Sequence, residues 1–296
     1  MVLRVGTDCS GIEAPIQALK KLKINYNHEW SCEIDKYARE SIKANYEPKL
    51  LFEDITKSRK LPNIDLYICG FPCQTFSMAG DRKGFGDPRG TIFYYCLKVI
   101  RTKKPKYFIL ENVKGLVNHD SGNSFKTILN CLNLLKIYDI YYKVLNTKDY
   151  GIPQNRERIF IIGINKSLKQ KFEFPKKKKM KDIKSFIDTS DKSKQAWPNY
   201  CNKSISKSKG VFLDATFINL VSSKSYQTYS PTICTNGHMW CKTMKRKANK
   251  KEYLKLQGFP SSFKVVVSSR QIKRQIGNSM SVNVLVEIFK ELLKCN

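Results

Sequence analysis

The amino-acid sequence predicts an α/β fold with an open, doubly wound sheet and a smaller inserted domain. Over the first ~165 residues, short apolar runs alternate with helical periodicity, which is the βαβ rhythm of such sheets. After Gly163 the rhythm fades, and the chain becomes rich in Lys, Ser, Asn and Tyr. The closing segment SMSVNVLVEIFKELLKC has one strongly apolar face, so we expect a helix that docks back on the first domain.

Each expected element follows from its local pattern. Apolar runs of strand length lie at 3–9, 28–34, 64–70, 106–113, 139–147 and 158–164. Apolar residues at helical spacing lie at 13–22, 36–46, 91–103, 124–136 and 249–257. Pro15 falls in the first turn of the first helix, where proline is tolerated. The stretch from 165 to about 245 is the expected second domain.

Composition narrows the class of protein. The 296 residues carry a formal net charge of +29, and such an excess attracts polyanions, usually nucleic acid. The excess is mostly lysine and comes with abundant Asn and Ile, which the codon usage of an A/T-rich genome also produces, so charge alone leaves the question open. No apolar run reaches the ~18 residues that cross a bilayer, and the N-terminus lacks a signal-peptide layout. We expect a soluble, intracellular protein without membrane contact.

Ten cysteines are scattered along the chain without a CxxC pair or a cluster with histidine, so we expect no zinc or other metal. Cys69 and Cys73 have CxxxC spacing, which alone is weak evidence for a metal site. Most of the others lie in apolar runs, where a free thiol packs as a small hydrophobe. This pattern is typical of a reducing compartment.

The turn after the first strand, GTDCSGIEAP, is where a doubly wound sheet binds its ligand. Gly11 lets the backbone approach a ligand, although the GxGxxG dinucleotide fingerprint is absent. Glu33 ends the second strand, where an acid typically holds ribose hydroxyls. Asp54 and Ile55 offer an acceptor and an apolar wall for an adenine ring. Each acid alone is as well explained as a helix cap, but together they predict an adenosine-containing cofactor such as S-adenosylmethionine.

The stretch ICGFPCQTFS places Cys73 on a turn after a buried strand. A single cysteine is more often a packed hydrophobe than a nucleophile. Here the polar loop 74–90, with four glycines and with Arg82, Lys83 and Arg89, favours an exposed thiolate beneath a mobile lid.

Two further strand ends carry polar groups. Glu111 follows the apolar residues of FILENVKG, so we expect it to be partly desolvated and to hold a proton readily. Gln154, Arg156 and Arg158 share one face if the segment is extended. Two guanidiniums and an amide on one face suit a phosphate or a polar base edge, and a solvated edge strand is the alternative.

Five motifs then occur in a familiar order: GFPCQTFS, ENVKG, QNRERIF, LQGFP and QIGNSMSVNVL. With them the sequence resembles the DNA (cytosine-5)-methyltransferases over roughly 1–165 and 248–292. The resemblance implies a Rossmann-like class I S-adenosylmethionine-dependent methyltransferase sheet. It also implies a catalytic domain of residues 1–165 plus 277–296, and a target-recognition domain of residues 166–276.

The resemblance implies covalent catalysis. Cys73 matches the nucleophile that adds to C6 of cytosine, and Glu111 matches the acid that bonds N3 of the ring. Arg156 and Arg158 match the pair that supports the site, with Arg158 near the cytosine carbonyl. Addition at C6 makes C5 nucleophilic enough to take the methyl group from S-adenosylmethionine, which leaves as S-adenosylhomocysteine.

The cofactor pocket is also carried over by resemblance. Its expected residues are Cys9, Ser10, Gly11, Ile12, Glu33, Ile34, Asp54, Ile55, Pro72, Ile92, Asn278 and Ser279. The chain departs from the family where Cys9 replaces an aromatic residue, Glu13-Ala14 replace Gly-Gly, and Ile34 replaces Trp or another bulky residue. We therefore expect a pocket of the same shape with weaker stacking on the cofactor.

The implied partner is double-stranded DNA, bound by a monomer that flips the target base out of the stack. Candidate DNA contacts in the variable region are Tyr200, Lys203, Lys207, Tyr226, Gln227 and Arg246, with Thr232 or Thr235 near its end. The expected location is a bacterial cytoplasm, or the DNA-containing compartment of a virus-infected or eukaryotic cell. The target sequence stays open because base readout depends on side-chain placement.

Three alternatives compete with this interpretation. An RNA cytosine-5 enzyme would use the same catalytic set, although QTFS after the Pro-Cys motif is the common DNA-type form. A non-enzymatic binding protein with the same fold would be expected to have lost Cys73, Glu111 or the arginines, and all are present. A nicotinamide dehydrogenase is disfavoured by the missing glycine fingerprint.

Overall fold

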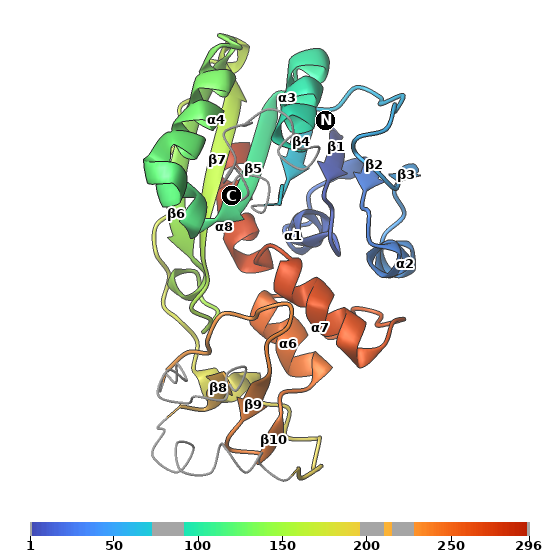
Figure 1. Cartoon of the computed structure of the whole chain (residues 1–296), viewed down its shortest axis with the longest axis vertical. Coiled ribbons are helices and arrows are strands. Elements are labelled where there is room, and N and C mark those ends of the chain that lie inside the picture. Colours follow the sequence, from blue (N-terminus) through green and yellow to red (C-terminus); the bar gives the residue numbers. More distant parts are fainter. Residues whose placement is uncertain (1, 73–91, 196–209, 215–227, 295–296) are drawn as a thin grey trace.

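The computed structural model describes residues 2–72, 92–195, 210–214 and 228–294 of the chain (Figure 1). Cys73 and the loop 74–90 lie outside these residues. So do five of the candidate DNA contacts, Tyr200, Lys203, Lys207, Tyr226 and Gln227.

A seven-stranded sheet forms the larger part of the molecule, in the order β3-β2-β1-β4-β5-β7-β6. Its strands are β1 (Leu3–Asp8), β2 (Tyr26–Cys32), β3 (Leu50–Phe52), β4 (Leu66–Cys69), β5 (Tyr107–Val113), β6 (Tyr138–Asn146) and β7 (Glu157–Asn165). Strand β7 runs antiparallel to both of its neighbours, and the other pairs are parallel. The predicted open α/β sheet is confirmed.

Helices cover both faces of this sheet (Figure 1). The helices are α1 (Ala14–Lys21), α2 (Lys36–Asn45), α3 (Ile92–Lys103), α4 (Asn123–Asn133) and α8 (Val282–Leu293). Apolar residues of α1 and α8, such as Ile16 and Phe289, pack in one cluster with Ile68 of β4. Those of α3 and α4, such as Phe93 and Ile128, pack in a second cluster. The closing helix therefore docks on the first part of the chain, as its apolar face predicted.

A smaller sheet follows along the chain, built from β8 (Phe212–Asp214), β9 (Met239–Cys241) and β10 (Arg246–Lys247). Two helices, α6 (Lys250–Gln257) and α7 (Ser269–Asn278), lie between this sheet and the large one (Figure 1). Short 3-10 helices span Lys114–Gly122, Thr147–Asp149, Lys166–Leu168 and Ile183–Phe186.

The ends of α6 have clear causes in the sequence. Asn249 and Glu252 form a reciprocal capping box at its start, which satisfies two backbone N–H groups that have no partner within the helix. Gly258 ends it with a φ of 90°, in the left-handed region that glycine adopts without steric cost. Among the described residues, no helix is long and apolar enough to cross a membrane.

Helix α7 was not expected, and it joins the two parts of the chain. Ser268 caps its start, and only one stripe, including Ile272, Gln275 and Ile276, is buried. Ser41 of α2 donates a 2.9 Å hydrogen bond to Gln275 Oε1. Because α7 also contacts the first part of the chain, the assignment of residues 166–276 to a separate recognition domain stays a prediction.

Candidate active site

The chain that leads to Cys73 leaves the carboxyl edge of the large sheet. Strand β4 ends at Cys69, and Gly70, Phe71 and Pro72 follow. On the next strand, β5, Asn112 Nδ2 donates a 2.9 Å hydrogen bond to the carbonyl oxygen of Phe71. The sequence places Asn112 with Glu111 at a strand end, where active-site groups of such sheets gather, but the predicted site residues did not include it.

Glu111 lies next to this bond and is 8% exposed. Its Oε1 is 3.4 Å from Nε of Arg158, so the two charges form a partly buried pair. Burial raises the pKa of Glu111 above 4.5, against the opposing attraction of Arg158 and Arg156. The carboxyl group is thus more easily protonated than a solvated one, as the sequence predicted.

Gly70 brings the main chain close to Glu111. A Cβ at this position would stand 2.9 Å from Met280 Cε and 3.5 Å from Glu111 Oε2. Glycine at position 70 therefore lets β4, Met280 and the buried acid approach one another closely.

Arg156 has a different environment from Arg158. It is 2% exposed, and its guanidinium donates to the carbonyl oxygens of Ile233 at 3.1 Å, Gly277 at 3.0 Å and Ser279 at 2.8 Å. Burial lowers its pKa to about 9, with a smaller contribution from Arg158. Arg156 therefore clamps its own segment to those of Ile233 and of Gly277 and Ser279, instead of presenting its charge to an open surface.

Gln154 is also wholly buried. Its Nε2 donates to the carbonyl oxygen of Leu256 at 2.8 Å and to Gln257 Oε1 at 2.9 Å. The hypothesis that Gln154, Arg156 and Arg158 converge on a phosphate or base edge is therefore wrong, because strand β7 begins only at Glu157. Of the three, Arg158 alone lies beside the candidate catalytic acid.

A hollow opens at the carboxyl end of β1. Five of the predicted cofactor residues line it: Cys9, Ser10, Gly11, Asn278 and Ser279. Seven others also line it: Thr7, Asp8, Ala14, Pro15, Ile68, Gly70 and Met280. The hollow therefore joins the first βα turn to the chain that leads to Cys73.

Glu33 stands at the end of β2 beside this turn. Its Oε2 accepts a 2.7 Å hydrogen bond from the Gly11 amide, and its Oε1 accepts one of 3.0 Å from the Asp35 amide. Burial raises the pKa of Glu33, against the opposing effect of these two amides. The next residue, Ile34, is 75% exposed and forms an open apolar surface next to the carboxylate.

The remaining predicted cofactor residues are more scattered. Ile12 and Ile55 are buried in the core, at 0% and 7% exposure. Asp54 accepts hydrogen bonds from the amide and hydroxyl of Thr56, which lower its pKa. Pro72 is exposed, and Ile92 is half-buried at the start of α3.

Asp8, on the wall of the hollow, is a residue that the sequence did not single out. Arg59 binds its two oxygens at 2.6 and 3.0 Å. Trp30 Nε1 and the Tyr67 hydroxyl donate to it at 3.1 and 2.8 Å. This buried network stiffens the floor of the hollow.

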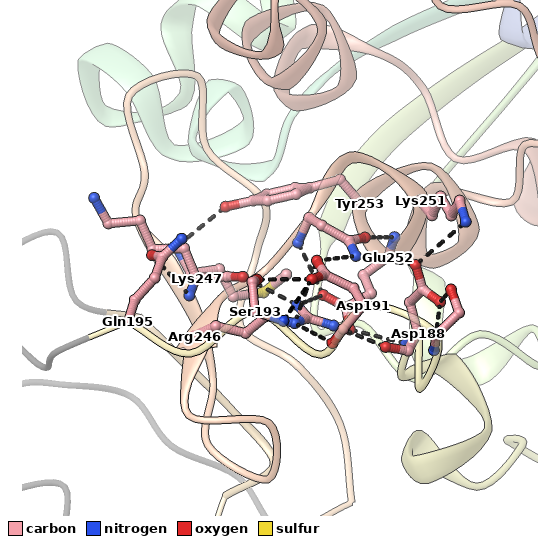
Figure 2. A network of polar contacts seen from close by, with 12 residues as sticks. Asp188, Asp191, Ser193, Gln195, Arg246, Lys247, Lys251, Glu252 and Tyr253 are labelled. Carbon is pink, nitrogen blue, oxygen red and sulfur yellow. Dashed lines mark hydrogen bonds and ion pairs between the residues drawn. The ribbon is translucent and has the colours of Figure 1, made fainter.

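Arg246 was expected to contact DNA, and its position contradicts this. It is 1% exposed and binds both carboxylate oxygens of Glu252 at 2.9 Å. Figure 2 shows the two side chains at the centre of a polar network with Asp188 and Asp191. The main-chain oxygens of these two aspartates also accept from the Arg246 guanidinium. The prediction is wrong because the charge of Arg246 is already neutralised inside the protein.

Thr232 and Thr235 are half-buried near the other end of the variable region. The Thr232 hydroxyl donates to the carbonyl oxygen of Asn155, so it is partly engaged within the protein. Within the described part of the chain, no group of three or more His, Cys, Asp or Glu side chains is placed to hold a metal ion.

The mixed sheet, with a hollow at the carboxyl end of β1 and a buried acid on β5, is the fold of the α/β methyltransferases. Residues 8–294 match the family described as C-5 cytosine-specific DNA methylase. The chain therefore belongs to this family, and the resemblance and enzyme class inferred from the motifs are confirmed.

Relatives of known type agree with this assignment. The chain is 36% identical over 288 residues to the type II methyltransferase M1.ScrFI of Lactococcus lactis subsp. cremoris, covering 90% of this chain and 72% of that protein. It is 38% identical over 270 residues to the type II methyltransferase M.HaeII of Haemophilus aegyptius, covering 86% and 82%. The solved structure of the S. pombe Dnmt2 methyltransferase has a TM-score of 0.68 at 19% identity, covers 99% of this chain and 98% of its own, and shows the shared fold.

Proposed function

We propose that the chain transfers a methyl group from S-adenosylmethionine to C5 of a cytosine flipped out of duplex DNA, through a covalent bond between Cys73 and C6. The observation that carries the proposal is the placement of Glu111. This buried acid, paired with Arg158, lies on the strand whose Asn112 holds the chain at Phe71, two residues before Cys73. An acid with a raised pKa suits the protonation of N3 as a thiolate adds to the ring.

The Cys73 thiolate forms a bond to C6, and Glu111 supplies a proton to N3, so that electron density accumulates at C5. C5 then forms its bond to the transferred methyl group. Loss of the C5 proton to a base, departure of the Cys73 thiolate and return of the N3 proton to Glu111 restore the neutral aromatic ring. In this scheme Arg158 orients Glu111 and the cytosine carbonyl, and Arg156 keeps the surrounding segments in place.

The described residues fit S-adenosylmethionine. Apart from its chain neighbours, no described residue lies within 4 Å of where a Cβ on Gly11 would stand, so a ligand can approach this backbone. Glu33 beside it offers a carboxylate for ribose hydroxyls, and Ile34 offers an apolar face for adenine. When bound, the cofactor supplies an electrophilic methyl group.

The residues proposed to hold the cofactor are those of the sequence prediction. Cys9, Ser10, Gly11, Glu33, Ile34, Asp54, Pro72, Ile92, Asn278 and Ser279 would surround it. Ile12 and Ile55 would support it from the core.

The proposed partner is double-stranded DNA, bound by a monomer inside the cell. The formal charge of +29 favours binding to the phosphate backbone. We assign target recognition to residues 166–276 and catalysis to residues 1–165 plus 277–296. A flipped base would enter at the carboxyl edge of the sheet, beside Glu111.

The test is methyl transfer from labelled S-adenosylmethionine to duplex DNA and, in parallel, to tRNA. Label in DNA that bisulfite sequencing maps to cytosine supports the proposal, and label found in tRNA alone overturns the choice of substrate. A duplex with 5-fluorocytosine at the mapped site should trap a covalent adduct on Cys73. A Cys73→Ala variant that methylates as fast as the unaltered protein would rule out the covalent mechanism.

A further inference from the structure

Glu13 occupies an unusual position for a charged residue. It directly precedes α1, is 0% exposed and has a φ of 58°. This is the left-handed region, in which a residue with a Cβ is sterically disfavoured. A charged side chain in the core also loses its hydration. Both costs imply that compensating contacts hold Glu13 in place.

Those contacts converge on one carboxylate oxygen. Glu13 Oε1 accepts from the hydroxyl of Thr7 at 2.5 Å and from that of Ser31 at 2.6 Å. His28 Nε2 lies 3.4 Å from the same oxygen and 3.0 Å from Ser31 Oγ. Glu13 thus joins the end of β1 to β2 through side chains that are themselves buried.

The carboxylate also sets the direction of a chain of hydrogen bonds, because it can only accept. Because Thr7 donates to Glu13, Thr7 Oγ1 can act only as the acceptor in its 2.8 Å contact with the Ser10 hydroxyl. The same hydroxyl also lies 3.2 Å from the carbonyl oxygens of Thr7 and Cys32. Ser10 Oγ in turn accepts from the Cys32 amide at 3.0 Å. The relay therefore runs from the Cys32 amide through Ser10 and Thr7 to Glu13.

This relay borders the hollow without placing Glu13 in it. Thr7 and Ser10 line the hollow, and Glu13 does not. Cys32 directly precedes Glu33, whose carboxylate accepts from the Gly11 amide at 2.7 Å. The relay links Ser10 to Cys32, and the second hydrogen bond links Gly11 to Glu33. Both therefore connect the first βα turn to the end of β2.

We propose that Glu13 is a positioning residue for S-adenosylmethionine. Through Thr7 and Ser10 it fixes the first βα turn against the end of β2, and so sets the distance between Gly11 and Glu33. It acts on cofactor affinity and touches neither cofactor nor cytosine. The inference rests on the proposed function for the identity of the ligand.

Three variants of Glu13 and one control test this. Glu13→Ala removes the acceptor. Glu13→Gly also removes the acceptor, and it relieves the strain of the left-handed backbone. The glycine variant therefore replaces the alanine variant if the latter folds poorly. Glu13→Gln keeps an oxygen that accepts from both hydroxyls. The control is Ser124→Ala on α4, which deletes a buried hydroxyl that bonds to His119. Ser124 is far from the hollow in sequence, and the apolar residues of α4 pack against the other face of the sheet.

The first measurement is the Kd for S-adenosylhomocysteine by calorimetry, together with the Kd for duplex DNA and the Tm without cofactor. We expect Glu13→Ala and Glu13→Gly to weaken cofactor binding by roughly tenfold or more, because small displacements of positioning groups have effects of this size. Glu13→Gln should recover most of the loss, and DNA affinity should change less than twofold. Unchanged cofactor affinity in the glycine variant, or equal losses for cofactor and DNA, overturns the proposal.

The second measurement needs no ligand. Hydrogen exchange of the Gly11 and Cys32 amides in the cofactor-free protein should be faster in Glu13→Ala and Glu13→Gly than in the unaltered protein or Ser124→Ala. Unchanged exchange at both amides would overturn the positioning role. If the unaltered protein binds no S-adenosylhomocysteine, the proposed function fails, and the exchange rates still decide whether Glu13 positions the turn.

Discussion

Asn112 on β5 donates a 2.9 Å hydrogen bond to the carbonyl oxygen of Phe71, which follows β4. The residue that fixes the chain before Cys73 is thus the direct neighbour of Glu111 in sequence. One dipeptide on β5 thus carries both the proposed catalytic acid and the amide that holds Phe71. Displacing the end of β5 would therefore move both side chains together.

Loss of this bond should impair catalysis more than binding. We expect Asn112→Ala to lower kcat by about 100-fold, because misplacement of a reacting group by ~1 Å has an effect of this size. The Kd for S-adenosylhomocysteine should stay within threefold. Single-turnover methylation and calorimetry measure the two quantities. Asn130→Ala, on the exposed side of α4, is the matched control. Equal activity of the two variants would contradict the role given to Asn112.

Glu111→Gln should slow methyl transfer by about 100-fold or more, because the amide cannot deliver a proton to N3. Its effect on stability has a defined sign. Burial raises the folded-state pKa of Glu111 above 4.5, so the folded protein holds this proton more tightly than the unfolded chain does. Its contribution to the free energy of unfolding therefore falls as the pH rises from 4.5 through the folded-state pKa.

Urea denaturation between pH 4 and 8 tests this pH dependence of the free energy of unfolding. The difference in unfolding free energy between Glu111→Gln and the unaltered protein should move in favour of the variant as the pH rises. A difference that is constant with pH, or that moves the other way, would show that the carboxyl group is not destabilised by burial.

Removing one partner of the buried ion pair between Arg246 and Glu252 should destabilise the protein more than removing both. Arg246→Met leaves the Glu252 carboxylate buried without its partner, which typically costs about 3–5 kcal/mol of unfolding free energy. The double variant Arg246→Met, Glu252→Met should regain part of that loss, because no unpaired charge remains. Lys247→Met, at the exposed neighbouring position, is the control. Chemical denaturation measures all four proteins, and a double variant less stable than Arg246→Met would contradict the expectation.

Gly163 in β7 should not tolerate a side chain. A Cβ there would stand 2.0 Å from Cε1 of Phe108 on the paired strand β5. We expect Gly163→Ala to cost at least about 1–3 kcal/mol, the usual range for overpacking. Phe108→Leu in the same chain should relieve the clash. Thermal unfolding of the single and double variants checks this, and no rescue by Phe108→Leu would mean that strain elsewhere is responsible.

The large sheet could be predicted because its strands are short apolar runs whose pattern is set locally. The elements that were missed have weak local patterns. Strand β3 has only three residues, and α7 is polar except for one narrow stripe that includes Ile272 and Ile276. Helix α7 is stabilised by contacts such as the one from Ser41, which lies 234 residues away in sequence.

The candidate site shows the same limit. Cys9, Ser10 and Gly11 could be placed because they follow a strand, and they do line the hollow. The sequence did not reveal that Arg246 is neutralised by Glu252, because exposure depends on which segments pack together. The roles of Asp8 and Glu13 were missed for the same reason, since their partners lie on other strands or beyond them.

The clamp around Arg156 has a consequence for synthesis on the ribosome. Its guanidinium binds carbonyl groups 77, 121 and 123 residues further along the chain, at Ile233, Gly277 and Ser279. A nascent chain cannot close this clamp until Ser279 has left the exit tunnel. Products that end before Gly277 should therefore be inactive, even when all of the large sheet has been made.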